Sequence, residues 1–331
     1  MIDDGQFDAS RREKAAQINT AVPNAARVAD FLNGGRDSFE VDRRAASSML
    51  GAAPATAVIV PSVLAFHQRA VRFLTLEAGI RQFIDVGTGL PGAETSRDLA
   101  QSVDPACRVV YVDNDPMVLT HVRAFSQSTS QGALVALDAK LTDPVPLLDG
   151  AAATLDFGRP TALLLPSTLP FIRDTARAAA IVSTLMAALS PGSYLAICHM
   201  ASDLDPALAA SADHWNRMSP LTVTLRSRAE VAALTTGLEP VDPGLVPVDE
   251  WRPTPAEARP GRAAPVYAVV ARKPALSGRV AGGEDARADQ THDLERTVTG
   301  SLSLNVMSVA QPTGIEQTII TFPFDCRRSN G

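Results

Sequence analysis

Hydrophobic residues follow a helical spacing through the first part of the chain. Over residues 25–50 this spacing is interrupted once, by the Asn-Gly-Gly sequence at residues 33–35. Asp37 and Glu40 then have the spacing of a capping box, in which two side chains bond to the free backbone amides of a helix start. We therefore expect a helix, a sharp turn and a second helix, followed by a third helix over residues 61–78 with one apolar face.

From about residue 80 onward, short apolar runs alternate with longer stretches of helical spacing. The expected strands cover residues 82–86, 108–112, 133–137, 161–165, 194–198 and 266–271. The expected helices cover residues 93–102, 116–126, 174–189 and 228–236. This alternation is typical of βαβ units. It predicts a Rossmann-like α/β fold, with a doubly wound, mostly parallel sheet over residues 80–274 and an N-terminal helical cap over residues 1–79.

Beyond residue 274 the composition changes to Gly, Arg, Asp, Ala and Thr, which predicts a linker up to about Gly300. Two apolar runs follow, over residues 301–309 and 315–324. They fit either a β-hairpin or a poorly ordered tail, and the sequence leaves both open. The expected division is therefore a cap, a sheet domain, and a linker with a tail over residues 275–331.

The composition limits the function further. With 331 residues and 46% hydrophobic positions, the chain can bury a large core. A formal net charge of -6, without a block of basic residues, argues against a nucleic-acid partner. Cys107, Cys198 and Cys326 are odd in number and far apart, which argues against disulfides or a metal site and favours a reducing compartment. We expect the first two thiols to be buried and inert.

The sequence shows no signal-peptide pattern and no apolar run of the ~18 residues that a membrane span needs. We therefore expect a cytoplasmic protein without a membrane partner. The sequence leaves open whether the chain forms a homo-oligomer.

The candidate chemistry begins where the strand at residues 82–86 ends. This strand runs into a glycine turn, in the sequence FIDVGTGLPG, where residues without a side chain let a ligand approach the backbone. Gly87, Gly89 and Gly92 match the G-x-G-x-x-G pattern of dinucleotide-binding folds. Asp85, however, precedes the first glycine by two residues, where a carboxylate suits a cationic amino group and not a pyrophosphate. The turn therefore favours S-adenosylmethionine, with an NAD-dependent reductase as the weaker alternative.

Further acids follow the next two strands. Asp113 ends an apolar strand about 25 residues after the glycine turn, where a carboxylate can accept both hydrogen bonds of a ribose diol. Asp115 is expected to cap the helix that begins at Pro116. Asp138, after the third strand, is placed either to recognise an adenine amino group or to cap a loop. Together these acids predict a nucleoside-type ligand at the carboxyl ends of the strands.

Several longer runs resemble one known family. They are ARVADFLNGGRDSFEVDR, FIDVGTGLPG, VVYVDNDPMVLTH, PGSYLAICH and GLEPVDPGLVPVDEWRP. They resemble the actinobacterial S-adenosyl methyltransferase family once catalogued as a domain of unknown function (DUF574), over about residues 20–274. The resemblance implies a class I Rossmann-like fold, S-adenosylmethionine as cofactor, S-adenosyl-L-homocysteine as its product and a small-molecule acceptor.

The resemblance also implies roles for individual residues. Asp85 and the glycine turn would hold the methionine end of the cofactor, and Asp113 with Asn114 would hold the ribose. The turn at residues 34–37 would sit in the cap over the cofactor. The residues expected to bind the cofactor are Asp85, Gly87, Thr88, Gly89, Leu90, Asp113, Asn114, Asp138 and Ala139.

Three pairs depart from the family pattern. The family has Ala-Asp after the third strand, a His pair after the fourth strand, and Asn-Arg in the helix before the first strand. Here these pairs are, in order, Ala139-Lys140, Pro170-Phe171 and Val63-Leu64. In the last two pairs polar groups give way to apolar ones, so we expect an apolar acceptor pocket. Its candidate residues are Phe31, Arg36, Phe66 and Phe171, with core packing as the alternative place for the phenylalanines.

Methyl transfer requires a positioned acceptor, and a base only where the acceptor must lose a proton. His199, at the tip of the fifth strand, is the candidate base; the alternative is a structural histidine satisfied by local hydrogen bonds. His67 and His121 are expected to be structural or exposed. The leading hypothesis is a methyltransferase that acts on a small molecule of secondary metabolism. The alternatives are a relative repurposed for cyclisation, hydration or rearrangement, and a non-catalytic nucleoside-binding regulator.

Overall fold

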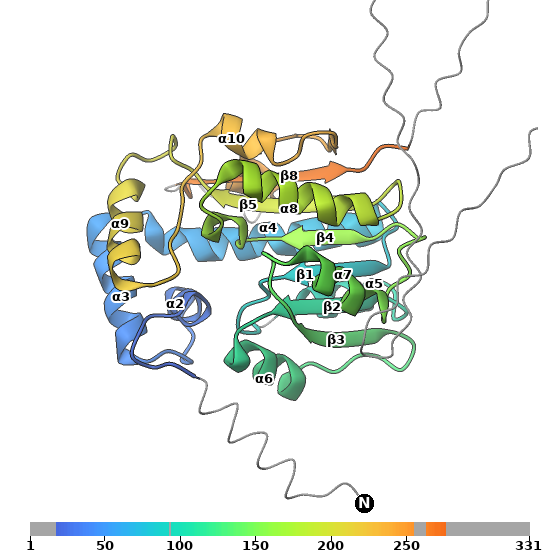
Figure 1. The fold of residues 1–331 in the computed structure, drawn as a ribbon, viewed down its shortest axis with the longest axis horizontal. Coiled ribbons are helices and arrows are strands. Elements are labelled where there is room, and N and C mark those ends of the chain that lie inside the picture. Colours follow the sequence, from blue (N-terminus) through green and yellow to red (C-terminus); the bar gives the residue numbers. More distant parts are fainter. Residues whose placement is uncertain (1–17, 93, 255–262, 276–331) are drawn as a thin grey trace, which may run out of the picture. The chain divides into compact units, whose positions relative to one another are not determined.

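The structure is a computed structural model, which describes residues 18–92, 94–254 and 263–275. Within this part of the chain, helices cover both faces of one central sheet (Figure 1). The predicted linker and the predicted hairpin or tail, over residues 276–331, lie outside the described residues.

The sheet has the strand order β3-β2-β1-β4-β5-β8-β6, and β7 also pairs with β8. Five strands run parallel: β1 (Gln82–Val86), β2 (Arg108–Asp113), β3 (Ala133–Asp138), β4 (Ala162–Leu165) and β5 (Tyr194–Met200). Three strands pair in the antiparallel sense: β8 (Val266–Arg272) with β5, and both β6 (Glu239–Pro240) and β7 (Val246–Pro247) with β8. The strand order reverses between β1 and β4, and such a switch point opens a crevice at the carboxyl ends of the strands.

Each face of the sheet buries its own hydrophobic cluster, because successive residues of a strand point to opposite sides. Phe83 and Val109 lie in one cluster, and Ile84 and Val110 lie in the other. The helices on the first face are α4 (Thr56–Leu76), α5 (Ser96–Val103) and α6 (Pro116–Phe125). Those on the second face are α7 (Pro144–Ala152) and α8 (Thr175–Ala188). The predicted doubly wound α/β fold is confirmed.

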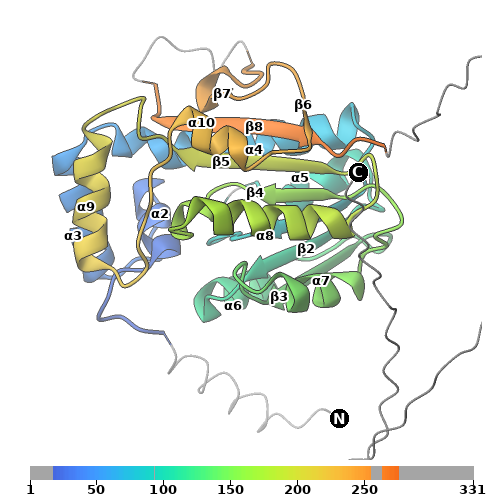
Figure 2. The ribbon, with the colours of Figure 1, turned by 45° about the horizontal axis from the view of Figure 1, so that its top comes forward.

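A third cluster forms a separate helical layer beside the sheet (Figures 1 and 2). It joins α2 (Ala25–Leu32) and α3 (Glu40–Ala52) to α9 (Leu208–Met218), a helix that follows β5 in the sequence. Trp215 of α9 is buried in this cluster. The cap is therefore built from two distant parts of the chain. By contrast, α4 packs on the sheet, although the sequence groups it with the N-terminal helices.

The remaining described elements are short. They are the 3-10 helices η1 (Leu169–Phe171) and η2 (Val248–Glu250) and the helix α10 (Arg228–Ala233). Val231 of α10 is buried against Tyr267 of β8.

Several predicted helix boundaries are wrong. The second helix does not begin with a capping box of Asp37 and Glu40: its N-cap is Phe39, whose backbone N–H donates to Asp42 Oδ2 at 2.8 Å. The Asp37 backbone N–H instead donates to Asp30 Oδ2 at 2.8 Å, within the turn between α2 and α3. The third helix begins at Thr56, so it includes Pro61. Helices α7 and α9 were not predicted.

Helix α4 also corrects an expectation drawn from uninterrupted apolar runs. Its 21 residues are long and apolar enough, by length and composition, to cross a membrane. In the structure, however, one face of α4 lies in the core, with Phe66, Ala70 and Leu74 buried against the sheet. The apolar composition of α4 is therefore explained by the face that it packs on the sheet.

Candidate cofactor site

The glycine turn after β1 requires glycine at two positions. Gly87 and Gly89 have φ angles of 71° and 66°, in the left-handed region that disfavours residues with a side chain. A Cβ atom on Gly87 would also lie 1.9 Å from Thr168 Cγ2. The Gly87 backbone N–H donates to the Val112 carbonyl oxygen at 2.8 Å, which ties the turn to β2. The turn therefore presents bare backbone at the switch point of the sheet.

Asp85 lies below this turn with its two carboxylate oxygens in different environments. The residue is 3% exposed. Its Oδ2 accepts a hydrogen bond from Ser96 Oγ at 2.6 Å and lies 3.3 Å from His67 Nε2. Its Oδ1 is buried and has no hydrogen-bond partner among the described residues. Because a buried polar atom without a partner is costly, this oxygen is the place where a cationic ligand group would be held.

Asp113 lies at the neighbouring strand tip, as the sequence predicts. Its Oδ2 accepts from the Gly89 backbone N–H at 3.4 Å, and its Oδ1 accepts from the Asp115 backbone N–H at 2.9 Å. Burial raises the pKa of the Asp113 carboxyl. The Gly89 contact joins the second acidic motif directly to the glycine turn. Asn114 beside it is exposed.

The third strand tip completes a row of polar positions. Asp138 is the partner of Asp113 in the register of β2 and β3, and its side chain is exposed. The Ala139 backbone N–H donates to the Asp113 carbonyl oxygen at 3.3 Å. The three strand tips that the sequence assigned to one nucleoside are therefore adjacent in space. Asp115 caps α6 through Met117 and Val118, which confirms its predicted role.

Two adjoining cavities, of about 170 Å³ and 280 Å³, open between the glycine turn and helices α2 and α4. Both are lined by Asn33, Leu64, His67, Asp85, Thr88, Leu90 and Gly92. Gly87 and Gly89 line the first cavity only. The residues at the tips of β2 and β3 line neither cavity. A larger hollow of about 690 Å³ lies between α8 and α10, away from all predicted site residues.

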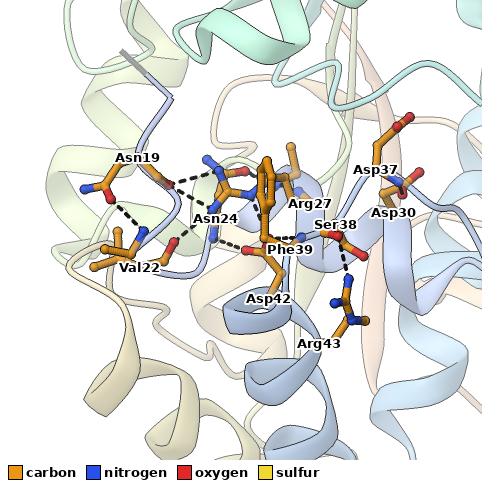
Figure 3. Close-up of polar contacts among 12 residues, drawn as sticks. Asn19, Val22, Asn24, Arg27, Asp30, Asp37, Ser38, Phe39, Asp42 and Arg43 are labelled. Atoms are coloured by element: carbon orange, nitrogen blue, oxygen red, sulfur yellow. Dashed lines mark hydrogen bonds and ion pairs between the residues drawn. The ribbon is translucent and has the colours of Figure 1, made fainter. Parts of the chain in front are cut away.

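The N-terminal cap is fixed beside this site by a buried ion pair (Figure 3). Arg27 Nε donates to Asp42 Oδ2 at 2.8 Å, and these side chains are 3% and 0% exposed. The Asn24 backbone N–H donates to Asp42 Oδ1 at 2.9 Å. The Asn24 side-chain amide reaches Asp115 Oδ2 at 2.5 Å, next to the tip of β2. These contacts hold α2, which lines the first cavity through Ala26, Ala29 and Asp30, over the strand ends.

The candidate acceptor residues are not brought together at the cavities. Phe66 is 1% exposed and packs edge-on against Trp251, with ring centroids 5.2 Å apart. Phe31 and Phe171 pack in the cluster of the cap, and Arg36 is exposed. Phe66 is therefore a core residue, which was the alternative to its place in the acceptor pocket. Val63 and Leu64, where the family pattern has polar residues, do line the first cavity and make it apolar.

His199, the candidate base, has no free nitrogen in this structure. The residue is 1% exposed. Its Nδ1 lies 2.9 Å from the Met200 carbonyl oxygen, and its Nε2 lies 2.6 Å from Arg226 Nη1. Burial, and then the charge of Arg226, lower the pKa of His199 to about 4. This environment fits the structural alternative and not the role of a base.

His67 is the site residue that the sequence reasoning missed. It was expected to be structural or exposed, yet it lines both cavities and contacts Asp85. Val63, Leu64 and His67 recur at helical spacing on one face of α4, so they meet the same surface. This spacing, read beside the departures from the family pattern, is the signal that could have identified His67.

The order of the sheet, bare backbone and a buried acid at the tip of β1, and a second acid at the tip of β2 define a class I methyltransferase. Residues 11–274 match the family described as S-adenosyl methyltransferase, and the chain belongs to this family. No curated protein matches the chain significantly.

Two solved structures are similar to this chain over most of its length. A DUF574 family protein from Streptomyces avermitilis MA-4680 is 38% identical, covers 77% of this chain and 99% of its own, and has a TM-score of 0.74. A candidate methyltransferase from Thermobifida fusca YX is 34% identical, covers 78% and 97%, and has a TM-score of 0.71.

The protein is therefore an S-adenosylmethionine-dependent methyltransferase. The residues present fit this cofactor. The partnerless Asp85 Oδ1 suits an ammonium group, and the open space at Gly89, where an added Cβ would meet nothing within 4 Å, lets a ligand lie against the backbone.

Proposed function

We propose that the protein methylates a small, largely apolar acceptor of secondary metabolism. The lining of the first cavity supports this proposal. Val63 and Leu64 of α4 line it with apolar side chains where the family pattern has a polar pair, so the wall beside the cofactor site favours an apolar acceptor. The methyl group comes from the sulfonium of the bound cofactor, and the protein contributes by holding donor and acceptor in line and excluding water.

The proposal gives each strand tip a part of the cofactor. Asp85 Oδ1 receives the α-ammonium of the methionine end, Asp113 receives the ribose hydroxyls, and Asp138 receives the adenine amino group. The observation that carries this assignment is the buried Asp85 oxygen without a partner. Thr88 and Leu90 line the cavity walls beside it.

A reducing compartment, and with it a cytoplasmic location, is part of the same proposal. Cys107 and Cys198 are buried and free. Burial raises the pKa of Cys107 to about 11 and the pKa of Cys198 well above its ordinary value. Both thiols therefore lack the thiolate character that reactive cysteines need.

Calorimetry of the full chain with S-adenosylmethionine tests the cofactor assignment. In Asp85→Asn the cofactor affinity should fall on the order of 100-fold, because a buried charge-assisted hydrogen bond to the ammonium is lost. Asp104→Asn is the matched control: Asp104 pairs with Arg81 at 2.6 Å, away from both cavities, and its loss should leave affinity unchanged. Absence of binding by the natural protein, or equal affinity in both variants, would contradict the proposal.

Incubation with radiolabelled S-adenosylmethionine and a panel of apolar metabolites tests the acceptor class. We expect label in one or more of the neutral compounds. The mass of the product then separates methyl transfer from cyclisation, hydration or rearrangement, because only transfer adds a methylene. An unlabelled product with an unchanged number of carbon atoms would contradict methyl transfer. It would favour a relative repurposed for cyclisation, hydration or rearrangement.

A further inference from the structure

The methionine end of the cofactor carries two opposite charges on one carbon atom. The assignment of Asp85 accounts for the ammonium only. The adjacent α-carboxylate must also find donors, since a buried charge without a partner is strongly unfavourable. A site that holds Asp85 against the ammonium therefore needs a donor for an anion close to Asp85.

Arginine and lysine do not supply this donor. Among the described residues that line the two cavities there is no lysine and no arginine. Arg72, near the second cavity, pairs with Glu94 at 3.1 Å, and Arg97 pairs with Asp98 at 2.8 Å. His67 is the side chain on both cavity walls that can carry a positive charge.

The position of His67 fits this need. Its side chain is 12% exposed, and its Nε2 lies 3.3 Å from Asp85 Oδ2. Asp85 thus keeps Oδ2 for His67 and Ser96 and leaves Oδ1 without a partner. No described residue forms a hydrogen bond with His67 Nδ1, so this nitrogen is available to a ligand in the cavity.

We infer that His67 binds the α-carboxylate of S-adenosylmethionine, next to the ammonium held by Asp85. An imidazolium between two carboxylates donates from both nitrogens, from Nε2 to Asp85 and from Nδ1 to the ligand. Asp85 and His67 therefore bind the zwitterionic amino-acid end of the cofactor together: Asp85 binds the ammonium and His67 binds the carboxylate. This inference rests on the proposed assignment of Asp85 to the ammonium.

Decarboxylated S-adenosylmethionine isolates this contact, because it keeps the ammonium and lacks the carboxylate. Calorimetry of the full chain should show S-adenosylmethionine binding about 10- to 100-fold more tightly than the decarboxylated form, as expected for one charge-assisted hydrogen bond. In His67→Gln this preference should fall below about threefold, while the affinity for the decarboxylated form changes little. His214→Gln, a histidine of α9 that bonds to Ser48 far from the cavities, should keep the full preference.

The outcomes separate this inference from the proposed function. If the natural protein does not bind S-adenosylmethionine, the proposed cofactor site is wrong. If the protein binds both ligands equally, or if His67→Gln keeps the preference, His67 does not contact the carboxylate. An equal loss for both ligands in His67→Gln would mean that His67 only orients Asp85. His67→Asn, checked for folding by circular dichroism, repeats the comparison if the Gln variant does not fold.

Discussion

Two histidines near the strand ends have opposite environments. His199 is the residue before the last of β5, and its two nitrogens contact the Met200 carbonyl oxygen and the guanidinium of Arg226. His67 comes from α4, contacts the carboxylate of Asp85 and faces two cavities. The first histidine has both nitrogens engaged within the protein, whereas the second has one nitrogen left for a ligand. A strand-tip position therefore predicts where a side chain lies, but its partners decide whether it can act.

Arg226 is the centre of the buried polar cluster that holds His199. Arg226 is 0% exposed, and it donates to the carbonyl oxygens of Leu169 and Ile172 as well as to His199. This cluster connects β5 to the segment around η1, which begins next to Thr168 and hence close to Gly87. Arg226 and His199 thus hold the segment whose Thr168 lies against Gly87, whereas His67 lines the two cavities.

The largest effect should come from removing the centre of the buried cluster. Arg226→Met leaves two buried carbonyl oxygens and one histidine nitrogen without their donor, which should lower the free energy of unfolding on the order of 4 kcal/mol. Arg123→Met is the control, since Arg123 is exposed and makes one bond of 3.2 Å to the Ala136 carbonyl oxygen. Urea unfolding measures both, and equal losses would show that Arg226 does not organise the cluster.

The second largest effect should be a pH-dependent contribution of His199 to the free energy of unfolding. Its pKa of about 4 in the folded protein lies below the ordinary value of 6.5, so the unfolded chain binds the proton more readily. The contribution of neutral His199 is therefore complete above about pH 6.5 and declines as the pH falls towards 4. Between pH 7 and pH 5 the natural protein should lose about 2 kcal/mol more than His199→Gln. Parallel unfolding curves at the two pH values would contradict this assignment.

The smallest effect on stability should come from the histidine that faces the cavities. His67→Gln keeps a donor for Asp85 and removes no buried core contact, so the free energy of unfolding should change by less than about 1 kcal/mol. Thermal unfolding in the absence of ligand measures this change. A loss as large as that of Arg226→Met would mean that His67 also belongs to the structural framework, and the contrast between the two histidines would disappear.

Sequence reasoning predicted that the residues of the proposed cofactor site meet at one edge of the sheet, because their signals are local. A strand that ends in Asp85, a glycine turn and a second strand that ends in Asp113 are each readable within a few residues. Parallel neighbours must then meet at one edge of the sheet. The structure places Asp113 Oδ2 within 3.4 Å of the Gly89 backbone nitrogen, as this logic requires. The acceptor half was not located, since it depends on which helix faces which strand.

Two further misses have the same physical origin. Helix α9 carries polar residues on much of its surface and shows its role only where Trp215 packs against α2 and α3. Phe66 has the same residue type as a pocket-lining side chain but lies against Trp251, 185 positions further along the chain. Such long-range contacts have no local signature in the sequence.

The sequence by itself determined the α/β class, the succession of the main strands along the chain, the backbone conformation of the glycine turn and the acids at the strand tips. These features follow from periodicity and from the steric freedom of glycine, which act over a few residues. Tertiary structure alone decided which of two histidines keeps a nitrogen free. That choice depends on the groups that distant segments bring against each imidazole: a guanidinium and carbonyls around His199, a carboxylate and open space beside His67.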